Sequence, residues 1–197
     1  MRLRFPSFLV VTFMLGSSLT SHAGSYVGVQ YQDVAKDNFC ESGPQLSCDD
    51  SKGFRASFGY KFNQISSIEF GYVDGGQAKK RYQAYEDTAE LKIFDAVYVA
   101  RYSLLEHLNL LGRAGLFYGQ EKGRYTYVDC SPTLGCQPHI SLESRSYEGA
   151  TLGIGLEWHN FTVSYDVDID LFNISNDYGV TSKTVARRLG VGYLIEF

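Results

Sequence analysis

Hydrophobic and polar residues alternate along most of the chain after residue 24, and a period of two is the pattern of a β-strand with one apolar face. The clearest run extends from Phe54 to Phe62, where every second residue is apolar and the residues between are polar or glycine. Seven further segments repeat this scheme, within residues 26–32, 68–72, 94–102, 109–118, 150–158, 161–171 and 188–197. The pattern therefore predicts eight strands, and no long segment shows helical periodicity.

The connections between these strands alternate between long and short. Residues 35–53, 75–88, 120–146 and 173–184 are long and polar, whereas residues 63–66, 103–108 and 159–160 are short. All long connections then lie at one end of an up-and-down sheet. This asymmetry is typical of outer-membrane barrels, which have short periplasmic turns and longer external loops. We therefore expect both ends of the mature chain on the periplasmic side.

The apolar face could line a soluble barrel or contact lipid. An eight-stranded barrel is just wide enough for side chains to fill it, and the apolar face carries too many Phe, Tyr and Leu side chains for that space. The opposite face is rich in glycine and carries charges of both signs. An Arg or Lys pointed at the bilayer midplane would cost about 2–4 kcal/mol. We therefore predict a closed antiparallel eight-stranded transmembrane up-and-down β-barrel with a polar interior.

The predicted interior face carries a candidate ionic network. Asp166, Asp168 and Asp170 share one face of the seventh strand, next to Arg188 on the eighth. Oxygen ligands also suit Ca²⁺, but arginines beside carboxylates favour ion pairs that plug the barrel, so we predict no metal and no cofactor. The network candidates are Arg55, Glu69, Arg101, Arg113, Glu157, Asp166, Asp168, Asp170 and Arg188. Lys61, Asp95 and Glu196 are further charges on this face.

Aromatic residues mark both ends of the predicted strands. Those beside the short turns are Phe62, Tyr102, Trp158 and Phe161, and those beside the long connections are Tyr31, Phe54, Tyr72 and Tyr118. Two aromatic girdles are typical of membrane interfaces, although aromatic residues also favour strands in general. The chain ends on a strand in which Tyr193, Ile195 and Phe197 alternate with other residues. This ending resembles the signal that outer-membrane barrels present to their insertion machinery.

The first 23 residues have the composition of a signal peptide. Arg2 and Arg4 precede an apolar run from Phe8 to Leu15, and Ser21 and Ala23 are small residues at the positions that a signal peptidase reads. We predict cleavage after Ala23 and a barrel domain over residues 24–197. The formal charge of −4 then falls to about −6 with the loss of two arginines. A mildly acidic chain excludes nucleic acid, which requires a clustered basic surface.

Four cysteines lie in the mature chain as two close pairs. The pairs, Cys40 with Cys48 and Cys130 with Cys136, predict two disulfides formed in an oxidising compartment, within the first and third long connections. A zinc site is less favoured. Neither pair has the Cys-x-x-Cys spacing, and His139 is the only nearby imidazole.

Two stretches carry a family resemblance. Residues 102–119, YSLLEHLNLLGRAGLFYG, resemble the turn into the fifth strand of the small eight-stranded outer-membrane barrels typified by the OmpA transmembrane domain, OmpX and Ail, with Gly112-Arg113 and Gly115 matching. Residues 153–157, GIGLE, resemble their sixth strand. The likeness covers nearly all of residues 25–197 but not the peptidoglycan-binding domain of OmpA. It implies surroundings of outer-membrane lipid and lipopolysaccharide, and assembly by the barrel-insertion machinery.

The resemblance to Ail-type proteins implies adhesion or host-factor binding through external loops, or a role in envelope integrity. Candidate binding residues in the third long connection are Arg124, Tyr125, Tyr127 and His139, which mix aromatic and charged side chains as binding surfaces do. A narrow ion channel is the alternative. A lipid-modifying enzyme is least favoured, because catalysis needs a base beside a nucleophile and the histidines are poorly placed.

Overall fold

The computed structural model describes residues 23–35, 47–49, 51–81, 86–131, 135–171 and 183–197. Within them lie the strands β1 (Gly24–Ala35), β2 (Ser47–Asp49), β3 (Ser51–Lys61), β4 (Ser66–Arg81), β5 (Glu86–Leu105), β6 (Leu108–Ser131), β7 (Gly135–Trp158), β8 (Phe161–Asp170) and β9 (Lys183–Glu196). This part of the chain contains no helix with the length and apolar character needed to cross a membrane. The predicted signal peptide lies outside the described residues apart from Ala23.

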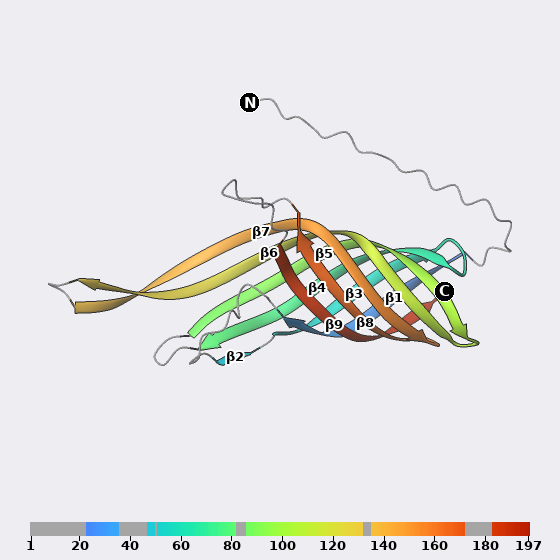
Figure 1. Ribbon diagram of the computed structural model, residues 1–197, viewed down its shortest axis with the longest axis horizontal. Coiled ribbons are helices and arrows are strands. Elements are labelled where there is room, and N and C mark those ends of the chain that lie inside the picture. The colour runs from blue at the N-terminus through green and yellow to red at the C-terminus, as the bar shows by residue number, and fades with distance from the viewer. Residues whose placement is uncertain (1–22, 36–46, 50, 82–85, 132–134, 172–182) are drawn as a thin grey trace, which may run out of the picture.

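Eight of these strands close into one antiparallel barrel (Figure 1). From β3 onward each strand pairs with the next along the chain, β1 pairs with β3, and β9 pairs with β1 to complete the ring. The short strand β2 pairs only with the far end of β4 and is not part of the ring. The predicted eight-stranded up-and-down barrel is confirmed.

The two ends of the barrel differ. Short turns join β3 to β4, β5 to β6 and β7 to β8 at the end where Tyr26 of β1 pairs with Glu196 of β9, and we call this the short-turn end. The opposite end is the long-loop end. The tightest turn is His159-Asn160, in which His159 adopts a φ of 54°. A positive φ at the first central position matches the twist of a two-residue hairpin, so the turn tolerates a conformation that non-glycine residues usually avoid.

Apolar side chains point away from the barrel and polar side chains point into it, as the alternation predicted. Burial alternates residue by residue in β1, β3 and β8. Ile154 on the outer wall is 65% exposed, whereas Arg188 on the inner wall is 0% exposed. Tyr31, Phe54 and Tyr118 are exposed near the long-loop end, as are Phe62, Tyr102, Trp158 and Phe161 near the short-turn end. Their position at membrane interfaces stays a prediction.

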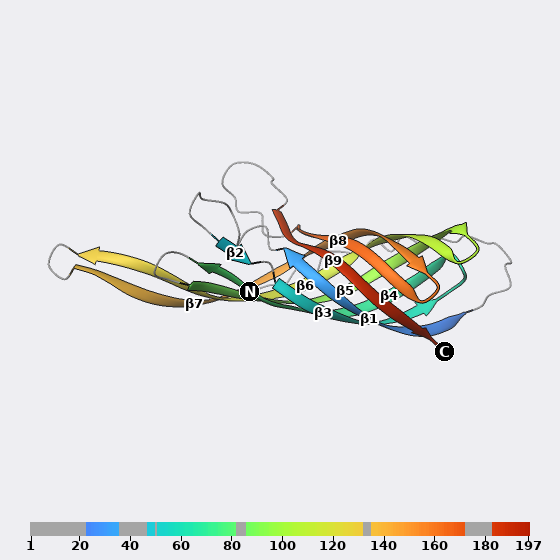
Figure 2. The same ribbon diagram turned by 90° about the horizontal axis from the view of Figure 1, so that it is seen from below.

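Strands β4 to β7 continue beyond the barrel at the long-loop end, and β6 and β7 project farthest (Figures 1 and 2). β6 and β7 stay paired out to Ser131 and Gly135, and β4 and β5 stay paired out to Arg81 and Glu86. The prediction of loops at 75–88 and 120–146 was therefore wrong for most of both ranges. Outside the membrane a strand carries polar residues on both faces, so its composition indicated a loop. We call residues 120–131 and 135–147 the projecting hairpin.

The outward wall gives the first prediction. Replacing Ile154 with Arg should block assembly, because a guanidinium near the bilayer midplane costs about 2–4 kcal/mol. Ile140→Arg is a matched control, because Ile140 is 56% exposed on the same strand and belongs to the projecting hairpin. Gln30→Arg, inside the barrel, should be tolerated better than Ile154→Arg. Folding yield in lipid vesicles measures all three, and equal yields for Ile154→Arg and Ile140→Arg would contradict the assignment of the lipid-facing wall.

Candidate functional site

The centre of the barrel holds buried arginines bridged by carboxylates. The Arg55 guanidinium donates to Oε2 of Glu69 at 3.0 Å and to Oδ1 of Asp95 at 2.8 Å. Arg188 donates to Oδ2 of Asp95 at 3.1 Å, and its Nε lies 2.8 Å from Oδ2 of Asp168. Asp95 of β5 thus joins two guanidiniums from β3 and β9, the two strands that flank β1. Because all these side chains are at least nine-tenths buried, their charges depend on one another rather than on water.

Glu69 joins this centre to the short-turn half of the lumen. Its Oε2 also accepts from Arg113 at 3.2 Å, and its Oε1 accepts from the Tyr26 hydroxyl at 2.9 Å. The Tyr26 ring needs the space that Gly59 leaves, since a Cβ at Gly59 would lie 2.1 Å from the ring carbon that carries the hydroxyl. The Glu69 carboxylate therefore links three side chains of the network, those of Arg55, Arg113 and Tyr26.

Arg101 extends the network to the short-turn end. It donates to the Ser67 hydroxyl at 2.6 Å, to Oε2 of Glu157 at 3.3 Å and to the Tyr26 hydroxyl at 3.3 Å. Asn109 donates to the other oxygen of Glu157 at 3.0 Å. Lys61 and Glu196 form a further ion pair at the rim. The hydrogen-bonded chain thus runs along much of the lumen.

The structure brings most of the sequence-predicted network residues together. Arg55, Glu69, Arg101, Arg113, Glu157, Asp168 and Arg188 exchange the contacts described above, and Asp166 lies 3.4 Å from Nε of Arg113. Asp170 is also buried in the lumen, one step farther along β8. Sequence reasoning placed Asp95 on the inner face but missed it as a network member. Asp95 and Arg101 are six residues apart on β5 and therefore face the same side of the strand. This spacing showed that the Asp95 side chain points into the barrel.

The carboxylates outnumber the arginines in the lumen. Six buried acids, Glu69, Asp95, Glu157, Asp166, Asp168 and Asp170, face four buried arginines, so the formal excess among these side chains is two negative charges (six minus four). Both carboxylate oxygens of Asp166 lack a hydrogen-bond donor among the described residues. No group of three or more metal-ligating side chains occurs in the described part of the chain.

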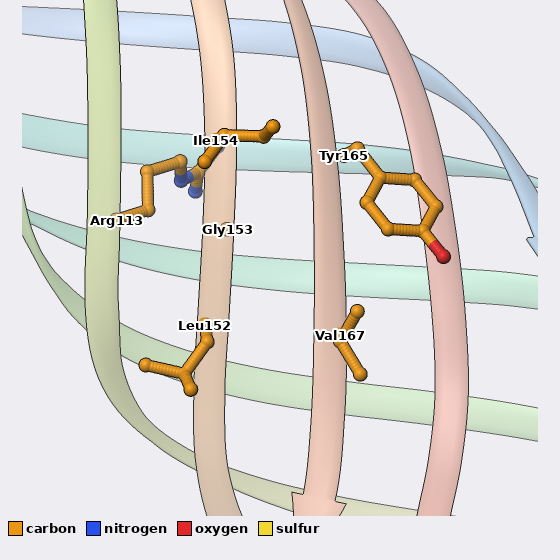
Figure 3. A pocket seen from close by; sticks show the side chains of 6 residues that line it. All are labelled: Arg113, Leu152, Gly153, Ile154, Tyr165 and Val167. Atoms are coloured by element: carbon orange, nitrogen blue, oxygen red, sulfur yellow. The ribbon is translucent and has the colours of Figure 1, made fainter.

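A shallow groove lies on the outer wall over β7 and β8 (Figure 3). Its volume is about 350 Å³, and its lining comprises Leu152, Ile154, Tyr165 and Val167, with Gly153 and the Arg113 side chain behind them. A Cβ at Gly153 would lie 2.0 Å from Oδ1 of Asp166, so the Asp166 carboxylate packs against the bare backbone of Gly153. Because its walls are apolar and face outward, this groove suits lipid chains rather than a polar substrate.

The inner face of the projecting hairpin carries a small tyrosine cluster. The hydroxyls of Tyr125 and Tyr147 donate to the two oxygens of Glu121 at 3.1 Å and 2.8 Å. Burial, assisted by the negative charge of Glu121, raises the pKa of Tyr125 to about 12. Tyr125 therefore remains a hydrogen-bond donor at physiological pH and holds the carboxylate on this face.

The outer face of the hairpin combines cations with exposed apolar side chains. The register pairs Arg124 with Leu142 and places Lys122 and Ile140 on the same face. Leu142 is 81% exposed, and neither cation forms an ion pair with another described residue. We call Lys122, Arg124, Ile140 and Leu142 the hairpin patch. Sequence reasoning missed Ile140 and Leu142, which alternate with polar residues just as membrane-facing residues do.

The four predicted binding residues separate onto two faces. Arg124 belongs to the hairpin patch, whereas Tyr125 is on the inner face. Tyr127 and His139 are paired in register, and His139 is exposed. The side chain of Tyr127 lies outside the described part of the structure. The structure thus divides the candidates between two surfaces.

For the predicted disulfides, the structure describes backbone positions only. Cys130 of β6 lies directly opposite Cys136 of β7. Directly paired residues have Cα atoms about 4.5–5.5 Å apart, within the range that a disulfide spans. Cys48 lies in β2, while Cys40 and the cysteine side chains lie outside the described residues. Both disulfides stay predictions.

A closed ring of eight strands, apolar outside and ionic inside, defines a membrane-spanning β-barrel. Residues 7–193 match the model of the outer membrane protein beta-barrel domain family, and the chain belongs to that family. The predicted resemblance to small outer-membrane barrels is confirmed, and the chain is a bacterial outer-membrane protein.

The chain is similar to several solved structures of small outer-membrane barrels. Ail of Yersinia pestis is 18% identical, with 88% of this chain and 97% of that chain covered and a TM-score of 0.44. Neisserial surface protein A is 13% identical, with 89% and 97% covered and a TM-score of 0.51. The N-terminal barrel domain of Pseudomonas aeruginosa OprF is 14% identical, with 86% and 97% covered and a TM-score of 0.46. Comparison with curated proteins gave no match.

The lumenal network gives the second prediction. Asp95→Asn should destabilise the barrel by about 3–5 kcal/mol, because it removes the anion that two buried guanidiniums share. Asp166→Asn is the matched control and should cost less than Asp95→Asn, because it removes one ion pair, with Arg113 at 3.4 Å, and no hydrogen bond. Denaturant unfolding in vesicles measures both. A cost for Asp166→Asn equal to that of Asp95→Asn would show that the bridging contacts do not determine stability.

Proposed function

We propose that this protein is a surface-interaction barrel that presents the projecting hairpin to a partner outside the cell. The hairpin patch is the observation that carries the proposal. It combines two exposed apolar side chains with two cations that have no partner among the described residues. The buried centres of interfaces are more apolar than the rest of a protein surface and are enriched in Arg.

The proposal requires the long-loop end to face outward. Outer-membrane barrels have short periplasmic turns and longer external connections, and all three short turns of this chain lie at the same end as Gly24 and Glu196. We therefore propose periplasmic termini and an external hairpin. The lumen itself is filled by buried side chains, which favours binding at the external surface over transport through the centre.

We propose no enzymatic activity. Hydrolysis needs a base beside a nucleophile. His107 and His159 stack on each other with ring centroids 4.4 Å apart at the short-turn end, which places two imidazoles side by side rather than a base beside a nucleophile. A changed acyl pattern of lipid A in a deletion strain, restored by the gene, would contradict this view.

We propose that the end of the chain takes part in assembly. Tyr193 and Ile195 are exposed on the outer face of β9, and Phe197, directly after the strand, is exposed too. We propose that the barrel-insertion machinery recognises these side chains and that lipid and lipopolysaccharide then surround the folded barrel. The outward direction of all three side chains supports this proposal, because the machinery could contact them before the barrel wall enters the membrane.

The hairpin patch gives the third prediction. Replacing both Ile140 and Leu142 with Asp should lower the binding of expressing bacteria to cultured animal cells about ten-fold or more, since burying one Ile or Leu side chain contributes about 1.5–3 kcal/mol. Gln77→Asp, on the outward face of β4, is the control and should not change binding. Unchanged binding of the double variant at equal surface level would refute the proposal.

The fourth prediction concerns the tip of the hairpin. We propose a disulfide between Cys130 and Cys136, which would lower the ordering cost of the tip when a partner binds. Thiol alkylation before and after reduction should label both cysteines only after reduction. Replacing both with Ser should increase proteolytic cleavage of the hairpin, whereas replacing Cys40 and Cys48 should leave hairpin cleavage unchanged. Alkylation of Cys130 without reduction would disprove the bond.

A further inference from the structure

A cluster of buried apolar side chains lies in the lumen, toward the long-loop side of the ionic network. Its members contact one another and are each at most 7% exposed. They come from six strands of the ring, β1, β4, β5, β6, β7 and β9. The layer comprises Val34, Val73, Leu91, Ile93, Phe117, Tyr147, Val185 and Ala186. We call it the apolar layer.

The apolar layer rests directly on the ionic network. Ile93 is the next inward-facing residue after Asp95 on β5, and Ala186 is the next after Arg188 on β9. On these two strands the inward-facing residue therefore changes from charged to apolar within a single step. On β8 the buried carboxylate of Asp170 follows Asp168, so a carboxylate borders the apolar layer there.

Phe117 is the largest purely apolar side chain of the layer, and its ring depends on two glycines. A Cβ at Gly149 would lie 3.0 Å from the Phe117 ring, and a Cβ at Gly119 would lie 3.5 Å from it. The Phe117 ring therefore lies against bare backbone on its own strand and on β7. The two glycines leave space beside the wall, and the Phe117 ring fills that space as part of the apolar layer.

We propose that the apolar layer, and not the ion-pair network, is the barrier to ions in this barrel, and that the path it closes is selective for small monovalent cations. Apolar constrictions stop ions because water leaves them, so that an ion would have to shed its hydration shell. The network, in contrast, offers charges and hydroxyls that replace hydration. Six buried acids against four arginines make this part of the lumen negative, which favours cations.

This inference is independent of the role proposed for the hairpin patch, because it concerns the lumen alone. It predicts that weakening the layer creates a conductance that the folded wild-type barrel lacks. It also predicts the sign of the selectivity, which a defect in the lipid around the barrel would not produce.

The fifth prediction is tested with full-length mature protein in planar bilayers. Phe117→Ala should give discrete current steps that are absent from the wild type, and under a KCl gradient its reversal potential should have the sign set by K⁺. Leu116→Ala is the matched control, because Leu116 is the neighbouring residue on the same strand and is exposed on the outer wall. Heat-modifiable electrophoretic mobility verifies that each variant is folded.

Two further variants keep the test decisive. Val34→Thr combined with Val73→Thr adds hydroxyls to the layer at nearly constant volume, so it should conduct even if Phe117→Ala does not fold. Arg188→Gln weakens the network but leaves the layer intact, so it should stay closed. Steps from folded Arg188→Gln without steps from the layer variants would overturn the proposal. So would silence of the folded layer variants, anion selectivity, or wild-type currents equal to theirs.

Discussion

Lipid on one side of a closed sheet is the constraint from which the rest of this structure follows. Alternate side chains of every strand contact lipid and must be apolar, so polar and charged side chains can point only into a lumen of fixed width. In that confined space a charge without a partner is costly. The result is a network in which Asp95 and Glu69 each serve two arginines.

The same constraint confines function to the ends of the barrel. The ionic network and the apolar layer fill the lumen, and lipid covers the wall, so the surface with freedom to bind a large partner is the part that leaves the membrane. There β6 and β7 remain paired far beyond the ring. A paired hairpin holds Arg124 and Leu142 in fixed register, which a flexible loop of the same composition would not do.

The alternation of residues predicted the number of strands, their direction and the facing of nearly every side chain, because a period of two has one geometric meaning in a sheet. It did not predict the projecting hairpin, since outside the membrane polarity no longer distinguishes strand from loop. It also missed the apolar layer, because Val34, Ile93 and Phe117 occur on the polar face and look like irregularities in sequence. Only the closed ring shows that they meet. The sequence also did not predict which ion pairs form, such as those of Asp95 with Arg55 and Arg188. These pairs depend on how far each strand is shifted relative to its neighbours, and no local sequence pattern encodes that shift.

The central claim is that the apolar wall contacts lipid tails while ion pairs fill a closed centre. The most direct measurement is quenching of tryptophan fluorescence by lipids brominated near the bilayer midplane, with Trp158→Phe as the background. Adding Ile154→Trp to that background should give strong quenching, whereas adding Ile140→Trp, on the projecting hairpin, should give little. Weak quenching with Ile154→Trp, together with a protein that stays soluble in water without detergent, would contradict the account.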